Sequence, residues 1–306
     1  HRTGAVIDRV MFLEILTVIA PVGVLAAIGF AWDRKGLPFD TNMVAYLVTN
    51  LGAPCLIVST LLANRPSLDV IAGMALAALM VVAVVALIAG VGLHLTGQSL
   101  KVYLPALTFP NSGNIGIPLC LFAFGDEGLA LSVSFFAVMA LTQFTLGISI
   151  AAGRVSAGAV FGNPVLWSAV LSFVLLTADA ELPRWVSGSV DTLAGMVIPL
   201  MLMSLGISLS RLKPNALMRS TIYSVLRLLL GLGAGVSVAW MLDLDGVARA
   251  AVIIQAAMPT AVFNYLFAVR YDNQPSEVAG IVVVSTILSF LTLPLLLAYA
   301  LSGPGL

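Results

Sequence analysis

Long apolar runs follow one another along almost the whole chain, and short polar stretches separate them. About 20 consecutive apolar residues are needed to cross the hydrocarbon core of a bilayer, so each run predicts a membrane-spanning helix. The pattern predicts ten spans, at Val10–Trp32, Asn42–Leu62, Leu68–Leu95, Val102–Phe124, Gly128–Ala152, Pro164–Ala178, Val190–Leu209, Ala216–Leu242, Gly246–Val269 and Ser276–Leu301. Because the apolar residues form runs and do not alternate with polar ones, the pattern argues against a membrane β-barrel.

Two of these spans, the fourth and the ninth, contain residues that weaken a helix. The fourth carries the segment Phe109–Pro118, with two prolines, two glycines, two asparagines and a serine, and the ninth carries Gln255–Asn264, with a central proline. A glycine inside a helix costs about 1 kcal/mol relative to alanine, and a proline about 3 kcal/mol. In lipid, a broken backbone persists only where protein or a watery cavity surrounds it. Paired interruptions of this kind point to the binding site of a secondary transporter.

The ten spans divide into two groups of five. An odd number of spans in each half makes the halves insert in opposite directions, which is an inverted repeat. Pro54 and Pro199, and likewise the two interrupted segments, recur with an offset of about 145 residues. We therefore predict an all-α polytopic membrane protein with broken, crossing helices four and nine. Its first repeat covers residues 1–152, a linker covers 153–162, and the second repeat covers 163–306.

The predicted loops differ in charge between the two sides of the membrane. One side holds Arg34, Lys35, Lys101, Arg154, Arg211, Lys213, Arg219 and Arg270, and the other holds Arg2, Arg9, Arg65, Arg184 and Arg249. Loops rich in Lys and Arg stay in the cytoplasm. We therefore expect both termini outside the cytoplasm.

The composition supports a membrane protein and gives no indication of an enzyme. Only 9% of the residues are charged and 60% are hydrophobic, whereas a soluble domain carries about 25% charged residues. The formal net charge is zero, so the sequence gives no reason to expect nucleic acid as a partner. HExxH, P-loop and clustered Cys/His metal motifs are missing. We expect no catalytic residues, no metal and no cofactor.

The two interrupted segments predict a site for a carboxylate. The start of a half-helix presents unpaired N–H groups and the positive end of the helix dipole. The candidate substrate-binding residues are Asn111, Ser112, Gly113, Asn114 and Pro118 in the first segment, and Pro259, Thr260 and Asn264 in the second. The alternative is a pair of proline kinks whose asparagine side chains only repair the backbone.

A few further polar residues lie inside predicted spans, where they are costly and indicate function. Arg227, flanked by leucines in the eighth span, either balances an anionic substrate or bonds to carbonyls exposed by the broken helices. Gln143 and Gln255 are candidates for a polar core that coordinates a cation. For Gln143, a contact between helices is an equal alternative.

Four segments resemble hallmark segments of the auxin efflux carrier family: Asn111–Pro118, Pro199–Gly206, Ala257–Asn264 and Ser285–Pro294. The resemblance covers nearly the whole chain, with the motifs in order and at the right spacing. Bacterial members of this family are similar to malonate and malate carriers, and plant members export auxin. The resemblance therefore implies a small organic anion as substrate.

The same resemblance implies a fold like that of the bile-acid sodium symporters. Helices 1, 2, 6 and 7 would form a scaffold, and helices 3–5 and 8–10 a mobile transport core. By this analogy Pro118 marks the first crossing point, and Asn264 stands where the plant exporters have a second proline. Pro259 is then the main breaker of the ninth span, and Gln143 falls near a polar position of the cation region.

We therefore expect a secondary transporter of a small organic anion, a mono- or dicarboxylate, that works by elevator-type alternating access. Na⁺ and H⁺ are candidate coupling ions, the lipid bilayer and the anion are the expected partners, and a homodimer is left open. Two rivals remain. One is a cation/proton antiporter on the same scaffold, and the other is a non-transporting membrane sensor whose breaks are only kinks.

Overall fold

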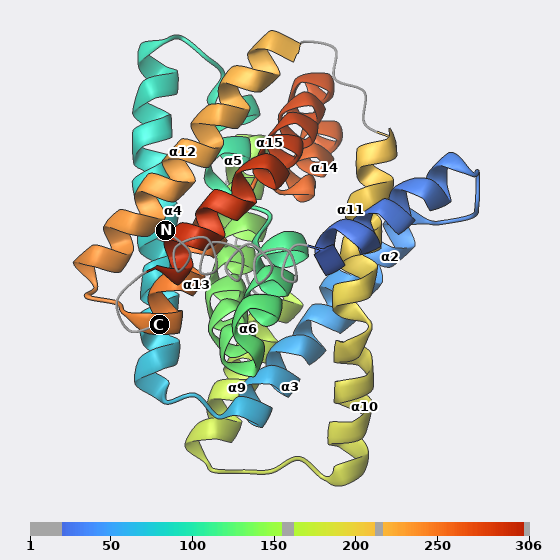
Figure 1. Ribbon diagram of the computed structural model, residues 1–306, viewed down its shortest axis with the longest axis vertical. Helices are drawn as coiled ribbons and strands as arrows, with labels where there is room; N and C mark the ends of the chain where they lie inside the picture. Colours follow the sequence, from blue (N-terminus) through green and yellow to red (C-terminus); the bar gives the residue numbers. More distant parts are fainter. Residues whose placement is uncertain (1–19, 155–161, 212–216, 303–306) are drawn as a thin grey trace, which may run out of the picture.

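The computed structural model describes residues 20–154, 162–211 and 217–302, and every regular element in these ranges is a helix (Figure 1). Residues 20–34 are helical. The following elements are α2 (Thr41–Leu47), η1 (Val48–Gly52), α3 (Ala53–Asn64), α4 (Leu68–Leu95), α5 (Leu100–Thr108), η2 (Ser112–Gly116), α6 (Ile117–Thr142), η3 (Gln143–Gly147), α7 (Ile148–Ala152), α9 (Pro164–Thr177), α10 (Arg184–Gly195), α11 (Val197–Arg211), α12 (Leu217–Met241), α13 (Gly246–Ala256), α14 (Val262–Arg270) and α15 (Pro275–Leu301).

Six helical stretches among the described residues are long and apolar enough to cross a membrane. They are Met43–Asn64, Leu68–Leu95, Ser112–Ala152, Arg184–Arg211, Met218–Met241 and Pro275–Leu301. This confirms the prediction of an all-helical, polytopic membrane protein. The first half of the first predicted span lies outside the described residues, and the arrangement as ten spans in two inverted repeats stays a prediction.

The longest of these stretches, Ser112–Ala152, is divided by Gly125. The backbone at Gly125 has φ 62° and ψ −146°, a conformation that is open essentially only to glycine. The chain therefore turns between Phe124 and Asp126, which is where the sequence predicts the boundary between its fourth and fifth spans.

Two of the predicted spans, the fourth and the ninth, are broken in their middle. The fourth consists of α5, an extended stretch at Phe109, and then η2, which leads into α6. The ninth consists of α13 and α14, which are separated by residues 257–261. Both predicted interruptions are thus confirmed as breaks in the helices.

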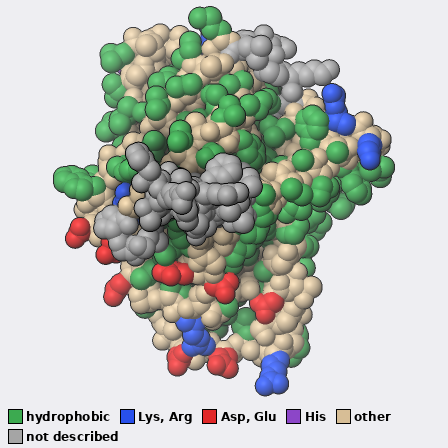
Figure 2. Space-filling view, viewed as in Figure 1, with side chains coloured by type: hydrophobic (Ala, Val, Ile, Leu, Met, Phe, Trp, Pro, Cys, Tyr) green, Lys and Arg blue, Asp and Glu red, His purple; other side chains and the backbone are tan. Residues whose placement is uncertain are grey.

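The helices are arranged around the two broken ones. In Figure 1, α4 and α12 lie on one side of the molecule, α10 and α11 lie on the other, and α5, α6 and α13 lie between them. Figure 2 shows hydrophobic side chains spread over the upper part of this face and acidic side chains gathered at its lower end. Residues 20–34 pack directly on α11: a Cβ atom on Gly206 would lie 1.8 Å from the carbonyl oxygen of Ala26.

Candidate functional site

The two helix breaks are joined by a short antiparallel bridge between Pro110 and Thr260. The backbone N–H of Asn111 donates to the carbonyl of Pro259 (2.7 Å), and the N–H of Ala261 donates to the carbonyl of Phe109 (3.1 Å). Buried backbone groups need such partners because leaving them unpaired costs free energy. The breaks therefore satisfy one another, which explains how both persist inside the protein.

Side chains form a second set of bonds around the bridge. The Nδ2 of Asn264 donates to the carbonyl of Phe109 (3.1 Å), and the Nε2 of Gln143 donates to the Oδ1 of Asn264 (3.2 Å). The Thr260 hydroxyl donates to the carbonyl of Ala106 (2.9 Å). Gln143, Thr260 and Asn264 are all buried. The structure thus brings together residues that are far apart in the sequence.

Arg227 lies on the side of the bridge where α5 and α13 end. It is 0% exposed, and its guanidinium donates to the carbonyls of Leu107 (2.5 Å), Thr108 (3.3 Å), Ala256 (2.5 Å) and Met258 (3.2 Å). Each helix C-terminus carries about −0.5 elementary charge, so one guanidinium balances the two ends. These contacts match the alternative in which Arg227 bonds to carbonyls that the broken helices expose.

The other side of the bridge carries the N-terminal ends of η2 and α14. A cavity of about 30 Å³ lies there, and residues Asn111–Asn114 and Gln143 contribute to its wall. Asn111 is 4% exposed, and its Nδ2 has no hydrogen-bond partner in the structure. The first N–H groups of a helix also have no partner within the helix. Unpaired donors therefore gather at this side of the crossing.

A larger cavity of about 520 Å³ adjoins the small one, since Val48, Asn114, Met201 and Phe263 line both. Its walls come from α2, η1 and α11 on one side, and from η2 and α14 on the other. Along α11 it is lined from Met201 to Arg211. Ten residues of helix span about 15 Å, so the cavity leads from the crossing to the end of α11.

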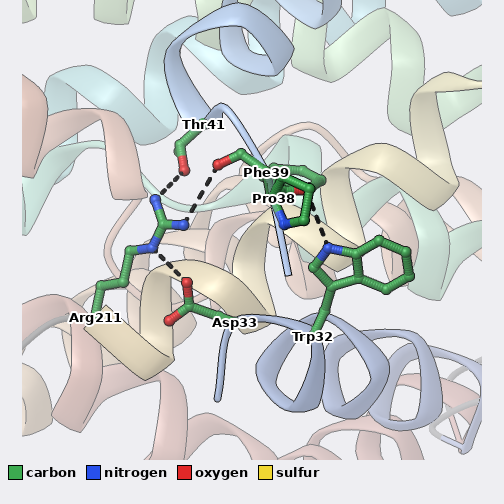
Figure 3. Close-up of polar contacts among 6 residues, drawn as sticks. All are labelled: Trp32, Asp33, Pro38, Phe39, Thr41 and Arg211. Atoms are coloured by element: carbon green, nitrogen blue, oxygen red, sulfur yellow. Dashed lines mark hydrogen bonds and ion pairs between the residues drawn. The ribbon is translucent and has the colours of Figure 1, made fainter. Parts of the chain in front are cut away.

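Arg211 holds the mouth of the large cavity together (Figure 3). Its Nε donates to Asp33 (2.7 Å), its Nη1 to the hydroxyl of Thr41 (2.8 Å), and its Nη2 to the carbonyl of Phe39 (3.4 Å). The hydrogen bond from Arg211 is the main cause that keeps the pKa of the Asp33 carboxyl below its ordinary value. Arg211 thus fixes the loop that forms one wall of the entrance.

Six predicted site residues line neither cavity: Pro118, Arg227, Gln255, Pro259, Thr260 and Asn264. Pro118 lies inside the continuous helical stretch that begins at Ser112, just after η2. The two broken segments meet at Pro110, eight residues before the crossing point that the family resemblance implies. Gln255 is 0% exposed and donates to the carbonyl of Ser132 (3.3 Å), while its Oε1 has no partner in the structure.

The sequence interpretation missed the polar residues that α11 contributes to the large cavity: Ser204, Ser208 and Arg211. Their spacing of four and then three residues places them on one face of a helix. That spacing, which begins within the Pro199–Gly206 motif, is the signal that could have identified them.

The comparison with known proteins identifies the family. A family model described as "membrane transport protein" matches residues 14–160 and 156–297, which is nearly the whole chain. The chain belongs to this family. The match confirms the family resemblance drawn from the sequence motifs, and the role that the family description names is membrane transport.

Two archaeal proteins are also similar to the chain. An uncharacterized transporter of Methanothermobacter thermautotrophicus is 29% identical over 198 residues, which cover 62% of this chain and 65% of that protein. An uncharacterized transporter of Methanocaldococcus jannaschii is 27% identical over 201 residues, which cover 60% and 63%. The matched part of the chain thus spans just under two thirds of the length of these relatives.

Proposed function

We propose that this transport protein is a secondary carrier of a small organic anion, a mono- or dicarboxylate, which binds at the N-terminal ends of η2 and α14. The observation that carries the proposal is the placement of Arg227. It balances the C-terminal ends of α5 and α13. Among the described residues, Arg227 is the one charged residue that is buried. The opposite, positive helix ends carry about +0.5 elementary charge each. With no buried carboxylate described beside them, they favour an anion.

The substrate contacts in this proposal are the unpaired donors beside the small cavity. Asn111, Ser112 and Asn114 lie at the first turn of η2. The side-chain Nδ2 of Asn111 has no hydrogen-bond partner in the structure. Thr260 and Asn264 instead bond to carbonyls of the first break. In the proposal they shape the site, and the first segment contacts the anion.

The large cavity is the route from the cytoplasm in this proposal. Its mouth lies at Arg211, and Asp33, which Arg211 binds, directly precedes Arg34 and Lys35. The positive-inside rule assigns this end to the cytoplasm. The described conformation is then open to the inside, with both chain termini outside in a bacterial inner membrane.

An elevator-type movement and a ten-span inverted repeat fit the same geometry. The boundaries of the two broken helices are related by nearly one offset: α5 and α13 end 148 residues apart, and η2 and α14 begin 150 residues apart. The large cavity runs along the boundary between the proposed scaffold, which includes α2 and α11, and the proposed core, which includes η2 and α14. A core moving along this boundary would carry the anion across.

The proposal can be tested by measuring carboxylate uptake into proteoliposomes. Asn111→Ala and Asn114→Ala should each reduce uptake at least about tenfold, because a hydrogen bond to a charged group contributes about 1.5–3 kcal/mol. Asn64→Ala is the control, because the Asn64 amide bonds to the carbonyl of Thr60 in α3, away from both cavities. Unchanged uptake in both variants would overturn the site. Sodium or proton flux without any organic anion would support an antiporter instead.

A further inference from the structure

A separate groove of about 460 Å³ lies between α4, α5 and α12. One wall comes from α4 at Ile88 and Gly92, and the other from α12 at Ile222 and Leu226. Ile88 and Ile222 are 53% and 51% exposed. On a helix bundle of this family, such exposed apolar side chains face the hydrocarbon of the bilayer. The groove is therefore open to lipid, on the outer surface of the bundle.

One end of the groove is polar. Arg219, Thr96 and Gln98 line it there. Arg219 is exposed, and its Nη1 makes a long hydrogen bond of 3.5 Å with the hydroxyl of Tyr103. Glu277 lies near enough to Arg219 to interact electrostatically, but it does not line the groove. Arg219 is thus the one charged residue among the described residues that line this groove, and it is positive.

The length of the groove matches one leaflet of a bilayer. Along α12 it is lined from Arg219 to Leu230, and eleven residues of helix span about 16 Å. The hydrocarbon core of a bilayer is about 30 Å thick, so the groove covers about half of it. Its cationic end lies at the beginning of α12, on the side where the positive-inside rule places the cytoplasm.

A second groove on the protein lacks this polarity and serves as a comparison. It has a volume of about 550 Å³ and lies among α3, α9 and α10, where Trp167 and Leu171 line it, and no Lys or Arg is among its lining residues. An acyl chain can fill either groove. Only the groove at Arg219 offers a partner for an anionic headgroup.

We infer that the groove between α4 and α12 binds an anionic phospholipid of the cytoplasmic leaflet. Its phosphate is held by Arg219 and the amide of Gln98, and one acyl chain lies along Ile88, Gly92 and Leu226. Basic pockets between membrane helices on the cytoplasmic side have the charge that such headgroups require. The floor of the groove is Leu107, whose carbonyl accepts a hydrogen bond from Arg227. A bound lipid therefore packs against the back of the helix crossing.

The test measures lipid binding to the purified protein in detergent by native mass spectrometry and by thermal unfolding. Phosphatidylglycerol and phosphatidylcholine with identical acyl chains are added separately. The wild type should bind phosphatidylglycerol more tightly and melt at a higher temperature in its presence. Arg219→Gln should lower the affinity for phosphatidylglycerol about fivefold, which corresponds to about 1 kcal/mol per basic residue at an anionic surface. Arg219→Lys should retain most of the preference for phosphatidylglycerol.

Two further variants separate the groove from general surface charge. Gly92→Leu should weaken binding of both lipids, because a Cβ at Gly92 meets no atom within 4 Å and a leucine side chain there enters the groove. Arg270→Gln removes a cation that the structure places over Tyr271, outside the groove, and should leave the preference unchanged. An equal loss in Arg270→Gln and Arg219→Gln, or no preference in the wild type, would overturn the inference. Neither result depends on transport.

Discussion

The Nη2 atom of Arg227 donates a hydrogen bond of 2.5 Å to the carbonyl of Ala256, the last residue of α13. A Cβ atom on Gly231, one turn after Arg227, would lie 2.2 Å from that same carbonyl oxygen. The absence of a side chain at Gly231 thus lets α12 approach the broken helix closely enough for the arginine to reach it. The arginine and the glycine act together to hold the crossing.

Replacing Arg227 should therefore destabilise the protein. Arg227→Met leaves four buried carbonyls without the donor that they share. A buried acceptor left without its hydrogen-bond donor costs about 1–3 kcal/mol. We expect a large fall in the melting temperature in detergent, together with loss of uptake. Arg184→Met, at the exposed start of α10, is the control, and an unchanged melting temperature in Arg227→Met would contradict the role.

Gly116 of η2 lies against the side chain of Gln255 in α13. A Cβ atom there would lie 2.2 Å from the Oε1 of Gln255, so Gly116→Ala should destabilise the crossing although alanine favours a helix by about 1 kcal/mol. Adding Gln255→Ala should restore much of the lost stability, because it removes the clashing atom. Gly73→Ala, which meets no atom within 4 Å, should not destabilise. Additive effects of Gly116→Ala and Gln255→Ala in thermal unfolding would refute the contact.

Arg211 should affect how fast an anion enters the large cavity. The removal of a cation from a cavity mouth lowers the local concentration of an anion, and salt screens this effect. Arg211→Gln should reduce initial uptake most at low ionic strength, so its difference from the wild type should shrink as salt increases. Arg211→Lys, which keeps the charge, should lie closer to the wild type. A deficit that is equal at all salt concentrations would indicate that Arg211 acts only by holding Asp33 and Thr41.

The Asp33 carboxyl predicts how the stability of the folded protein changes with pH. Its pKa is lower in the folded protein than the ordinary value of 3.8, chiefly because Arg211 donates to it. A lowered pKa contributes stability that is present above the unfolded value and is lost as the pH falls through the folded value. Asp33→Asn should therefore be less stable than the wild type at neutral pH, and the difference should shrink below pH 3.8. A difference that grows on acidification would contradict the sign.

The breaks themselves could be predicted from the sequence because proline, glycine and asparagine affect the backbone locally. Phe109–Pro118 and Gln255–Asn264 both contain the observed interruptions. The partners of the breaks could not be predicted, because they depend on how distant segments pack. Pro118 shows this limit: the family resemblance favoured it as the crossing point, yet the bridge forms eight residues earlier. A proline in a local pattern does not show which distant backbone groups will lie beside it.

Arg227 shows the same limit for side chains. Its position in an apolar span indicated a special role, and both interpretations were compatible with the sequence. The four carbonyls around it are the contacts of the structural interpretation, and the sequence alone did not reveal them. The spacing of the polar residues on α11 marks one face of that helix, but which segments that face lies against depends on packing that a linear pattern does not contain.

The bridge between Pro110 and Thr260 is made by main-chain atoms alone. Side-chain substitutions in the two segments therefore leave the backbone hydrogen bonds that align them in place. In the proposed mechanism, the side chains at the first turn of η2 set which anion binds, and the main-chain bridge sets how the two broken segments align. The proposed specificity could then be changed by substitutions at that turn while the alignment of the two segments is kept.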